Sequence, residues 1–264
     1  MVNKARSKDG TPIAYERSGD GPPLVAVPGV LTSSRLWPVL PTLAEHFTVY
    51  AVDRRGHGDS GDADCYQIER EFEDVAAVVD AIGTEVNLLG HSFGGQCVLG
   101  AALLTSNIRR LIVYETDSPE GMDPQVLPAG LLERFEALVD AGDRAGAVTT
   151  FFREAFQMTP EEIEVAKTWP TFPAMVAAAH TFPREVRASQ SHHFAKQRIS
   201  QMRVPALLLV GGDSPDVVKA GMESWHAILP GSRITVLPGQ EHLAHYTAPD
   251  LFVHEVVSFV KDLA

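Results

Sequence analysis

The chain has 264 residues, of which 45% are hydrophobic, enough for one large α/β domain or for one domain with an insertion. The net charge of −12 at pH 7 argues against a nucleic acid or an anionic membrane surface as a partner. Residues 1–10 are polar and no apolar run is long enough to span a membrane, so we expect no secretory signal, no membrane partner and a cytoplasmic location. The two cysteines indicate neither a disulfide framework nor a zinc site, and we expect no bound metal.

The first half of the chain alternates short apolar runs with helical stretches. The apolar runs are bounded by turn residues and predict buried strands at 13–16, 24–27, 49–52, 86–89 and 111–114. The stretches between them predict helices at 36–44, 68–82 and 95–104. This alternation favours a mostly parallel sheet that is covered by helices on both faces.

The middle of the chain lacks a convincing strand. Short helices are predicted there at 131–141, 145–156 and 160–167, with prolines at 160, 170, 173 and 183 breaking them. The alternation then resumes, with strands at 206–210 and 233–237 and helices at 217–228 and 249–263. The sequence therefore predicts a core made of residues 1–118 and 203–264, with residues 119–202 inserted as a helical segment between two strands.

Residues 90–94 form a Gly-x-Ser-x-Gly turn between the predicted strand 86–89 and the small-residue helix after it. This layout is typical of a nucleophile elbow, in which a strained turn exposes the hydroxyl of the central serine, here Ser92. Glycine is needed on both sides because a Cβ there would collide with neighbouring backbone. The N-terminus of the following helix adds free N–H groups beside the reacting atom. The alternative, a serine that merely caps a helix, does not explain why glycines crowd it.

A serine hydroxyl needs a base that takes its proton, an acid that orients the base, and donors for the developing oxyanion. His242 is the best candidate for the base, because it lies in a loop just beyond the last predicted strand, at the same sheet edge as Ser92. The other histidines considered are weaker candidates, since they lie one turn later, in the elbow, or in the insertion: His245, His91, His192 and His193.

With these motifs the chain resembles the α/β-hydrolase superfamily over essentially its whole length. The matching segments are a Pro-Gly-Val loop at 28–30, a polar loop at 53–60, the elbow at 90–95 and the histidine loop at 238–242. The resemblance implies a doubly wound, mostly parallel sheet with a helical cap between strands six and seven. It implies an oxyanion hole made by the backbone N–H groups of Val30 and Phe93, although Pro28 stands where the family usually has histidine. It also implies a structural role for Asp53 and Arg54, and no cofactor.

The acid of the triad has two candidates. Most members of the superfamily carry an aspartate in a Gly-x-x-Asp pattern after strand seven, but here that position is Ser214, with Asp213 one residue early and Asp216 late. Some members, including lactone hydrolases that resemble the zearalenone-degrading enzymes, place a glutamate at the end of strand six. Glu115 occupies that position here, and a carboxylate that ends an apolar strand is costly unless it is paired. We therefore prefer Glu115 and keep Asp213 as the alternative acid.

The insertion is rich in aromatic and methionine side chains, which favours a pocket for a largely apolar substrate. Trp169, Phe172 and Met175 are candidates for lining it. Trp37, which follows the oxyanion loop, is a further candidate that could line the pocket or lock that loop. The plainer alternative is that most such residues form the core of the insertion itself.

A serine, a histidine, a carboxylate and two N–H donors are what acyl transfer to water requires. We therefore expect a serine hydrolase that cleaves a carboxylic ester or lactone of an apolar small molecule through an acyl-enzyme. A C–C hydrolase or a cofactor-free perhydrolase of haloperoxidase type would use the same residues, and a small-molecule receptor on this fold is the non-enzymatic alternative. Epoxide hydrolases and haloalkane dehalogenases of this superfamily are excluded, because they need an aspartate in place of Ser92. The sequence does not indicate an oligomeric state.

Overall fold

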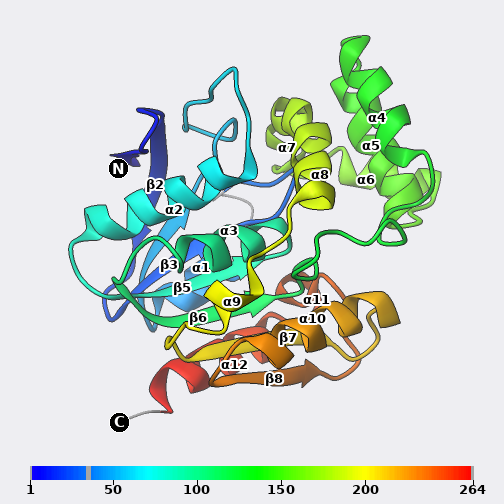
Figure 1. The fold of residues 1–264 in the computed structure, drawn as a ribbon. Helices are drawn as coiled ribbons and strands as arrows, with labels where there is room; N and C mark the ends of the chain where they lie inside the picture. The colour runs from blue at the N-terminus through cyan, green and yellow to red at the C-terminus, as the bar shows by residue number, and fades with distance from the viewer. Residues whose placement is uncertain (1, 34–36, 263–264) are drawn as a thin grey trace.

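An eight-stranded sheet forms the centre of the molecule in the computed structural model, which describes residues 2–33 and 37–262 (Figure 1). The strands are β1 Val2–Arg6, β2 Pro12–Ser18, β3 Pro23–Val27, β4 Thr48–Val52, β5 Val86–His91, β6 Ile108–Tyr114, β7 Ala206–Gly211 and β8 Ser232–Leu237. Their order is β1-β2-β4-β3-β5-β6-β7-β8. The pairs β1–β2 and β2–β4 are antiparallel, whereas β4, β3 and β5 to β8 run parallel. The carboxyl ends of these parallel strands therefore meet at one edge, where ligands bind in sheets of this kind.

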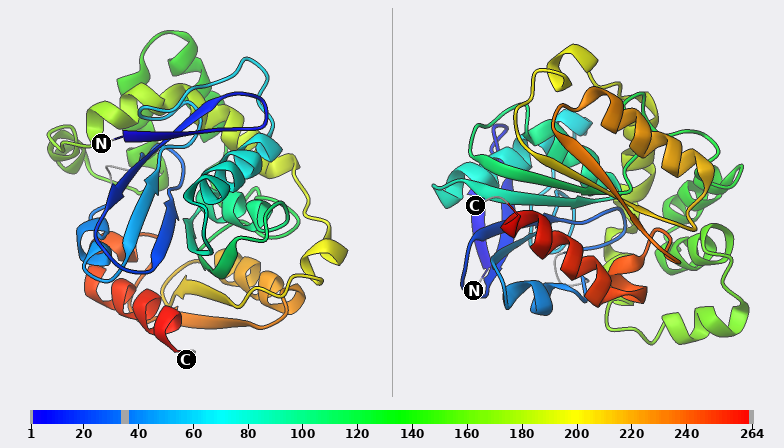
Figure 2. Two further views of the ribbon diagram at one scale, coloured as in Figure 1. Left: turned by 90° about the vertical axis from the view of Figure 1, so that its left-hand side faces the viewer. Right: turned by 90° about the horizontal axis from the view of Figure 1, so that it is seen from below.

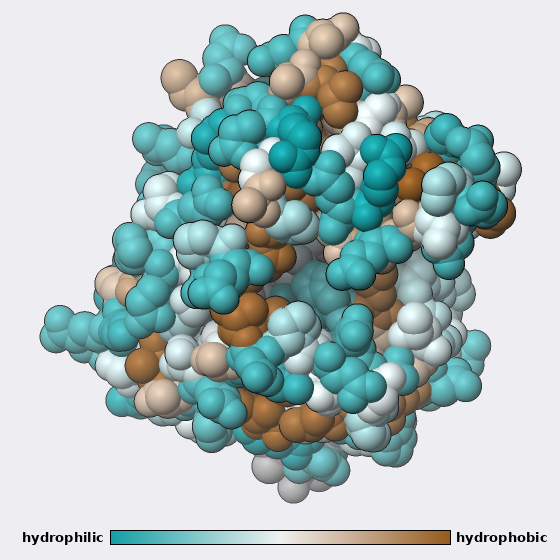
Figure 3. Space-filling view, turned by 90° about the vertical axis from the view of Figure 1, so that its right-hand side faces the viewer, coloured by the Kyte–Doolittle hydropathy of each residue, from teal (hydrophilic) through white to brown (hydrophobic). Residues whose placement is uncertain are grey.

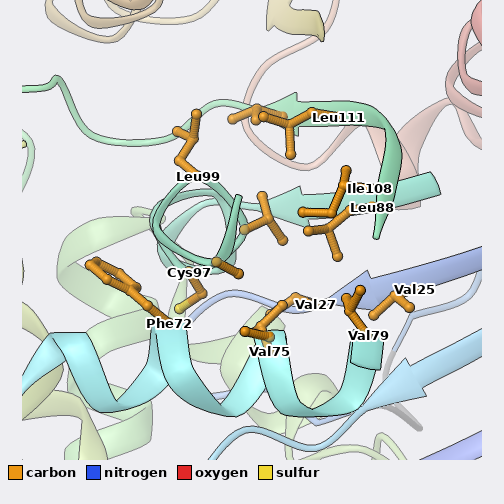
Figure 4. Close-up of a cluster of buried hydrophobic side chains, with 14 of the residues drawn as sticks. Val25, Val27, Phe72, Val75, Val79, Leu88, Cys97, Leu99, Ile108 and Leu111 are labelled. Atoms are coloured by element: carbon orange, nitrogen blue, oxygen red, sulfur yellow. The ribbon is translucent and has the colours of Figure 1, made fainter. Parts of the chain in front are cut away.

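Helices cover both faces of the sheet (Figure 2). One face carries α2 Ile68–Ile82, α3 Phe93–Ala101 and α10 Asp216–Ile228, and the other carries α1 Leu40–Ala44 and α12 Pro249–Lys261. Neighbouring residues of one strand point to opposite faces, as the two-residue period of a strand requires. Val25 and Val27 pack under α2 and α3 (Figure 4). Leu24 and Ala26 belong to the cluster on the other face.

Each predicted strand of the core is present, and α2 has the predicted bounds. β1 is not among the predicted strands, because it is largely exposed and pairs only with β2, so it lacks the apolar pattern of a buried strand. The helix expected at 36–44 is shorter and begins at Leu40, while position 36 lies outside the described residues.

The segment between β6 and β7 is helical, and we call residues 119–202 the cap. Its helices are α4 Leu131–Asp140, α5 Arg144–Ala155, α6 Pro160–Ala166, α7 Phe172–Ala178, the 3-10 turn η2 Ala179–Thr181, α8 Phe182–Ser191 and α9 Lys196–Ile199. The last four elements were not predicted. Pro160, Pro173 and Pro183 lie in the first turn of α6, α7 and α8, where a missing N–H costs nothing, so they start helices instead of breaking them.

The cap has an apolar core of its own, centred on residues of α4, α5 and α8 such as Phe135, Phe152 and Phe182. Leu31, from the loop after β3, is buried in this cluster, and Val30 packs against it as well as against the core cluster under α2 and α3. The loop after β3 therefore lies between the sheet and the cap. In the part of the chain that is described, we find no helix with the length and apolar character needed to cross a membrane.

Candidate active site

The register of the sheet brings three strand ends together. Val27 at the end of β3 pairs with Gly90 of β5, and His91 at the end of β5 pairs with Tyr114 at the end of β6. The residues that follow these strands, the loop 28–31, Ser92 and Glu115, are therefore neighbours although they are far apart in the sequence.

Ser92 lies between β5 and α3 in a strained conformation, with φ 55° and ψ −127°. Its N–H donates to the carbonyl of Tyr114 at 2.9 Å, and its carbonyl accepts from the N–H of Gly95 at 2.8 Å. The flanking glycines leave no room for a side chain, since a Cβ on Gly90 would lie 2.4 Å from the carbonyl oxygen of Gly94. A Cβ on Gly94 would lie 2.3 Å from the carbonyl oxygen of Val27. The turn is therefore a nucleophile elbow in its geometry.

Backbone strain is concentrated here. Four non-glycine residues of the described chain have a positive φ, and three of them, Leu31, Ser92 and Glu115, follow β3, β5 and β6. Such a conformation costs on the order of 1–3 kcal/mol each and clusters at functional sites. This distribution supports the placement of a functional site at the sheet edge.

The carboxylate of Glu115 holds the imidazole of His242. Nδ1 of His242 donates to Oε2 of Glu115 at 2.8 Å, and the glutamate side chain is fully buried. Its other oxygen, Oε1, accepts from the N–H of Gly211 at 2.6 Å and from the hydroxyl of Ser214 at 2.5 Å. Burial acts to raise the pKa of Glu115, but the hydrogen bond and charge of His242, with the two other donors, outweigh it and keep the pKa below its usual value. The glutamate is thus an anion at neutral pH.

The alternative acid does not make this contact. Asp213 is exposed in the loop after β7, and among the described residues no hydrogen bond joins it to His242. Ser214, at the position where most of the superfamily has the acid, instead donates to Glu115. Asp216 starts α10. The hydrogen bond expected for Glu115 is therefore present, and the one considered for Asp213 is not.

Side chains at the ends of β5 and β6 form hydrogen bonds with the loop that carries His242. The hydroxyl of Tyr114 donates to the carbonyl of Glu241 and accepts from the N–H of Ala244. Nε2 of His91 donates to the carbonyl of His242 at 3.0 Å. These contacts were not predicted, because the sequence gives no sign that two strand-end side chains reach a loop more than 120 residues away.

The competing histidines have other roles. His245 is buried against the ring of His91 at 4.4 Å between centroids, and burial, helped by the charge of His242, lowers its pKa to about 3. His192 lies 3.3 Å from Glu69, in contact with α2, and is not part of this group. His242 is therefore the histidine that the structure joins to a carboxylate at the elbow.

The loop after β3 approaches the serine closely. A Cβ on Gly29 would lie 3.0 Å from Cβ and 3.5 Å from Oγ of Ser92. Phe93 is the first residue of α3, so its N–H belongs to the free N-terminus of that helix. Val30 follows Gly29, and Phe93 follows Ser92. Both residues predicted for the oxyanion hole are therefore next in the chain to a residue at the serine hydroxyl.

The predicted pocket residues separate into two groups. Phe172 and Met175 are partly buried against the apolar core of the cap, and Trp169 is 42% exposed with its ring 6.0 Å from that of Phe152. Trp37 is buried on the opposite side, between the sheet and α12, against the rings of His91 and His245. Its packing against His245 of the histidine loop favours the second of the two roles considered for it, that of locking a loop, over that of lining a pocket. The face toward which the parallel strands end is hollowed, with apolar residues bordering the hollow (Figure 3).

A sequence profile described as "Alpha/beta hydrolase family" matches residues 24–255. The chain belongs to the α/β hydrolase family. A crystal structure of an α/β hydrolase from Sphaerobacter thermophilus shares 36% sequence identity, covers 98% of this chain and 100% of that chain, and superposes with a TM-score of 0.81. An esterase from Rhodococcus sp. ECU1013 shares 26% identity over 100% of this chain and 99% of that chain, with a TM-score of 0.76. A bifunctional esterase/perhydrolase from Acinetobacter calcoaceticus is 28% identical to this chain, and the match covers 97% of this chain and 98% of the Acinetobacter protein.

Proposed function

We propose that this α/β hydrolase cleaves a carboxylic ester or lactone through an acyl-enzyme. The observation that carries the proposal is the hydrogen bond of 2.8 Å between His242 and the buried anion Glu115, at the sheet edge where Ser92 lies in a strained elbow. A histidine fixed in this way presents its other nitrogen, Nε2, as the base that a serine hydroxyl needs.

In the first half of the reaction, Nε2 of His242 takes the proton of Ser92 while Oγ attacks the carbonyl carbon of the substrate. The tetrahedral intermediate places its negative oxygen at the N–H groups of Val30 and Phe93. Glu115 stabilises the imidazolium without itself taking the proton. The imidazolium then gives its proton to the leaving alkoxide, which departs as an alcohol or, for a lactone, as the other end of the same molecule.

In the second half, His242 takes a proton from water, and the resulting hydroxide attacks the acyl-enzyme. The new tetrahedral intermediate uses the same two N–H groups. Its collapse breaks the bond to Ser92, and the proton held by His242 returns to Oγ. A carboxylic acid is released and the starting state is restored.

The charges of the cap favour an uncharged substrate. Three of its arginines are already paired: Arg134 with Glu154, Arg184 with Asp62 and Arg187 with Glu136. The carboxyl of Asp117 lies near enough to His242 for their charges to interact. A carboxylate on the substrate would have to approach this acidic surrounding, in a chain of net charge −12, so neutral apolar esters and lactones fit better.

A fluorophosphonate probe tests the nucleophile, since it reacts only with an activated serine. We expect labelling of the wild type, none of Ser92→Ala, and hydrolysis of p-nitrophenyl butyrate and of a neutral lactone. A p-nitrophenyl ester of the same length that ends in a carboxylate should show a kcat/KM lower by about tenfold or more, which is about 1.4 kcal/mol of discrimination. A wild type that resists labelling would favour the small-molecule receptor, because its serine would not be activated. Labelling without hydrolysis of any ester or lactone would assign the site to another chemistry, such as cleavage of a C–C bond.

A further inference from the structure

Arg54 lies under the candidate oxyanion hole and contacts both of its sides. Its Nη2 donates to the carbonyl of Gly29 at 2.9 Å, and its guanidinium carbon lies 4.8 Å from the centre of the Phe93 ring. The side chain is fully buried. One cation thus touches the loop after β3 and the first residue of α3.

The contact with Gly29 fixes a whole peptide plane. The carbonyl of Gly29 and the N–H of Val30 belong to the same planar amide and point in opposite directions. An arginine that grips the carbonyl from below therefore holds the N–H of Val30 toward the opposite side. The same positive charge draws electrons toward the carbonyl oxygen, which strengthens the N–H as a donor.

Arg54 is itself held by two buried carboxylates. Glu71 of α2 accepts from Nη1 at 2.9 Å, and Glu185 of α8 accepts from Nη2 at 2.9 Å. Burial acts to raise the pKa of Glu185, but the charges of Arg54 and His57 and the hydrogen bonds from Arg54 and Thr181 together outweigh it, so the pKa lies below its usual value. Burial raises the pKa of Glu71 to about 7, despite Arg54. Glu185 is therefore the carboxylate that stays ionised beside the guanidinium.

Glu185 comes from the cap. It lies in α8, 131 residues from Arg54 in the sequence, and the same Nη2 atom that bonds to its carboxylate also bonds to the carbonyl of Gly29. His57 adds a second contact between the loop of Arg54 and the cap, because its Nε2 lies 3.2 Å from the hydroxyl of Thr181 at the start of α8. A displacement of α8 would remove the counter-ion of Arg54 and free the guanidinium to turn away from Gly29.

We propose that Arg54 is a positioning residue for the oxyanion hole, and that Glu185 makes the geometry of the hole depend on a seated cap. The inference rests on the proposed hydrolytic function, since it assigns the N–H of Val30 to the oxyanion. It goes beyond a scaffold role for Arg54, because the part it holds is the donor that stabilises the transition state.

The test compares two buried ion pairs of the same loop. In the first pair, Arg54→Lys keeps the charge but has a single nitrogen in place of the forked guanidinium, and Glu185→Gln removes the counter-ion with little change of shape. The matched control is Asp74→Asn, which breaks the bidentate pair of Arg55 with Asp74, both bonds at 2.7 Å. That pair is equally buried, but its bonds run to Asp74, Asp9 and the carbonyl of Arg70, none of which belongs to the candidate site.

Four quantities are measured for each variant: kcat and KM for p-nitrophenyl butyrate, the Ki of an alkyl boronic acid that forms a tetrahedral adduct with Ser92, and Tm. We expect Arg54→Lys and Glu185→Gln to lower kcat about tenfold or more, with a matching loss of boronic acid affinity and a KM within about threefold of the wild type. Asp74→Asn should lower Tm but keep kcat and Ki within about threefold.

The inference would be overturned if Asp74→Asn lost as much kcat as Arg54→Lys and Glu185→Gln. It would also be overturned if Arg54→Lys left the Ki of the boronic acid unchanged. Either result would leave the hydrolase function intact. A wild type that fluorophosphonate does not label would overturn both. The two failures are therefore distinguishable.

Discussion

Replacing Glu115 by glutamine tests the triad most sharply, because the structure dictates how the amide must sit. Gly211 and Ser214 both donate to Oε1, at 2.6 and 2.5 Å, so the amide oxygen of the variant takes that place. The NH₂ group then faces Nδ1 of His242, where the carboxylate oxygen had accepted at 2.8 Å. An NH₂ group can only donate, so Nδ1 must become the acceptor and the proton must move to Nε2. In this tautomer Nε2 cannot take the proton of the serine.

The expected loss in kcat is about 10² to 10⁴, which corresponds to about 3 to 5 kcal/mol of transition-state stabilisation. Steady-state kinetics with p-nitrophenyl butyrate measure it, and Tm verifies that the fold survives. Asp213→Asn is the matched control, since Asp213 is an exposed carboxylate of the neighbouring loop, and it should stay within about threefold of the wild type. If Glu115→Gln kept kcat within tenfold, or if Asp213→Asn lost more, the assignment of the acid would be refuted.

The other predictions concern the nucleophile, the base and the buried histidines. Ser92→Ala should lower kcat by several orders of magnitude in the ester assay while Tm changes little, because alanine keeps the Cβ of the strained turn; near-native turnover would rule out an acyl-enzyme. His242→Ala should cost about as much as the loss of the serine in the same assay, and far more than His245→Ala; the reverse order would exchange their roles. Burial lowers the pKa of His57 to about 4 and that of His245 to about 3, so between pH 6.5 and these values the unfolded chain binds protons that the folded chain does not. These two histidines therefore make the free energy of unfolding fall as the pH is lowered from 6.5 to 4, an effect that the raised pKa of Glu71 opposes. The comparison of wild type with His245→Phe by urea unfolding at each pH isolates the histidine: the variant should lose at most about 1.4 kcal/mol per pH unit of this fall, and a slope equal to that of the wild type would contradict the reasoning.

The sequence predicts the parts of the site that depend on local pattern. The strands of the parallel core are short apolar runs between turns, and Ser92 lies in a motif whose glycines have a steric reason. The choice of Glu115 over Asp213 rests on the resemblance to the superfamily, in whose Gly-x-x-Asp pattern Asp213 lies one residue early, and on the cost of an unpaired carboxylate at the end of an apolar strand. In each of these cases the information lies within a few neighbouring positions.

The parts that the sequence does not predict depend on contacts between distant segments. Trp37 carries no sign of which face of the sheet its loop lies on, and packing against α12 decides it. The cap helices α7 and α8 were missed because a proline can start a helix as well as end one. The partnership of Arg54 with Glu185 joins residues 131 positions apart, and only the docking of the cap on the core reveals it.

The bond between Ser214 and Glu115 has a consequence for the charge beside His242. The hydroxyl of Ser214 already touches the carboxylate that holds His242, so an aspartate at that position would place its own carboxylate beside the same oxygen. A protein carrying both acids would share one proton between them, because two adjacent carboxylates resist double ionisation. Ser214 therefore supplies by a neutral hydroxyl the contact that a second carboxylate would make at the cost of this repulsion.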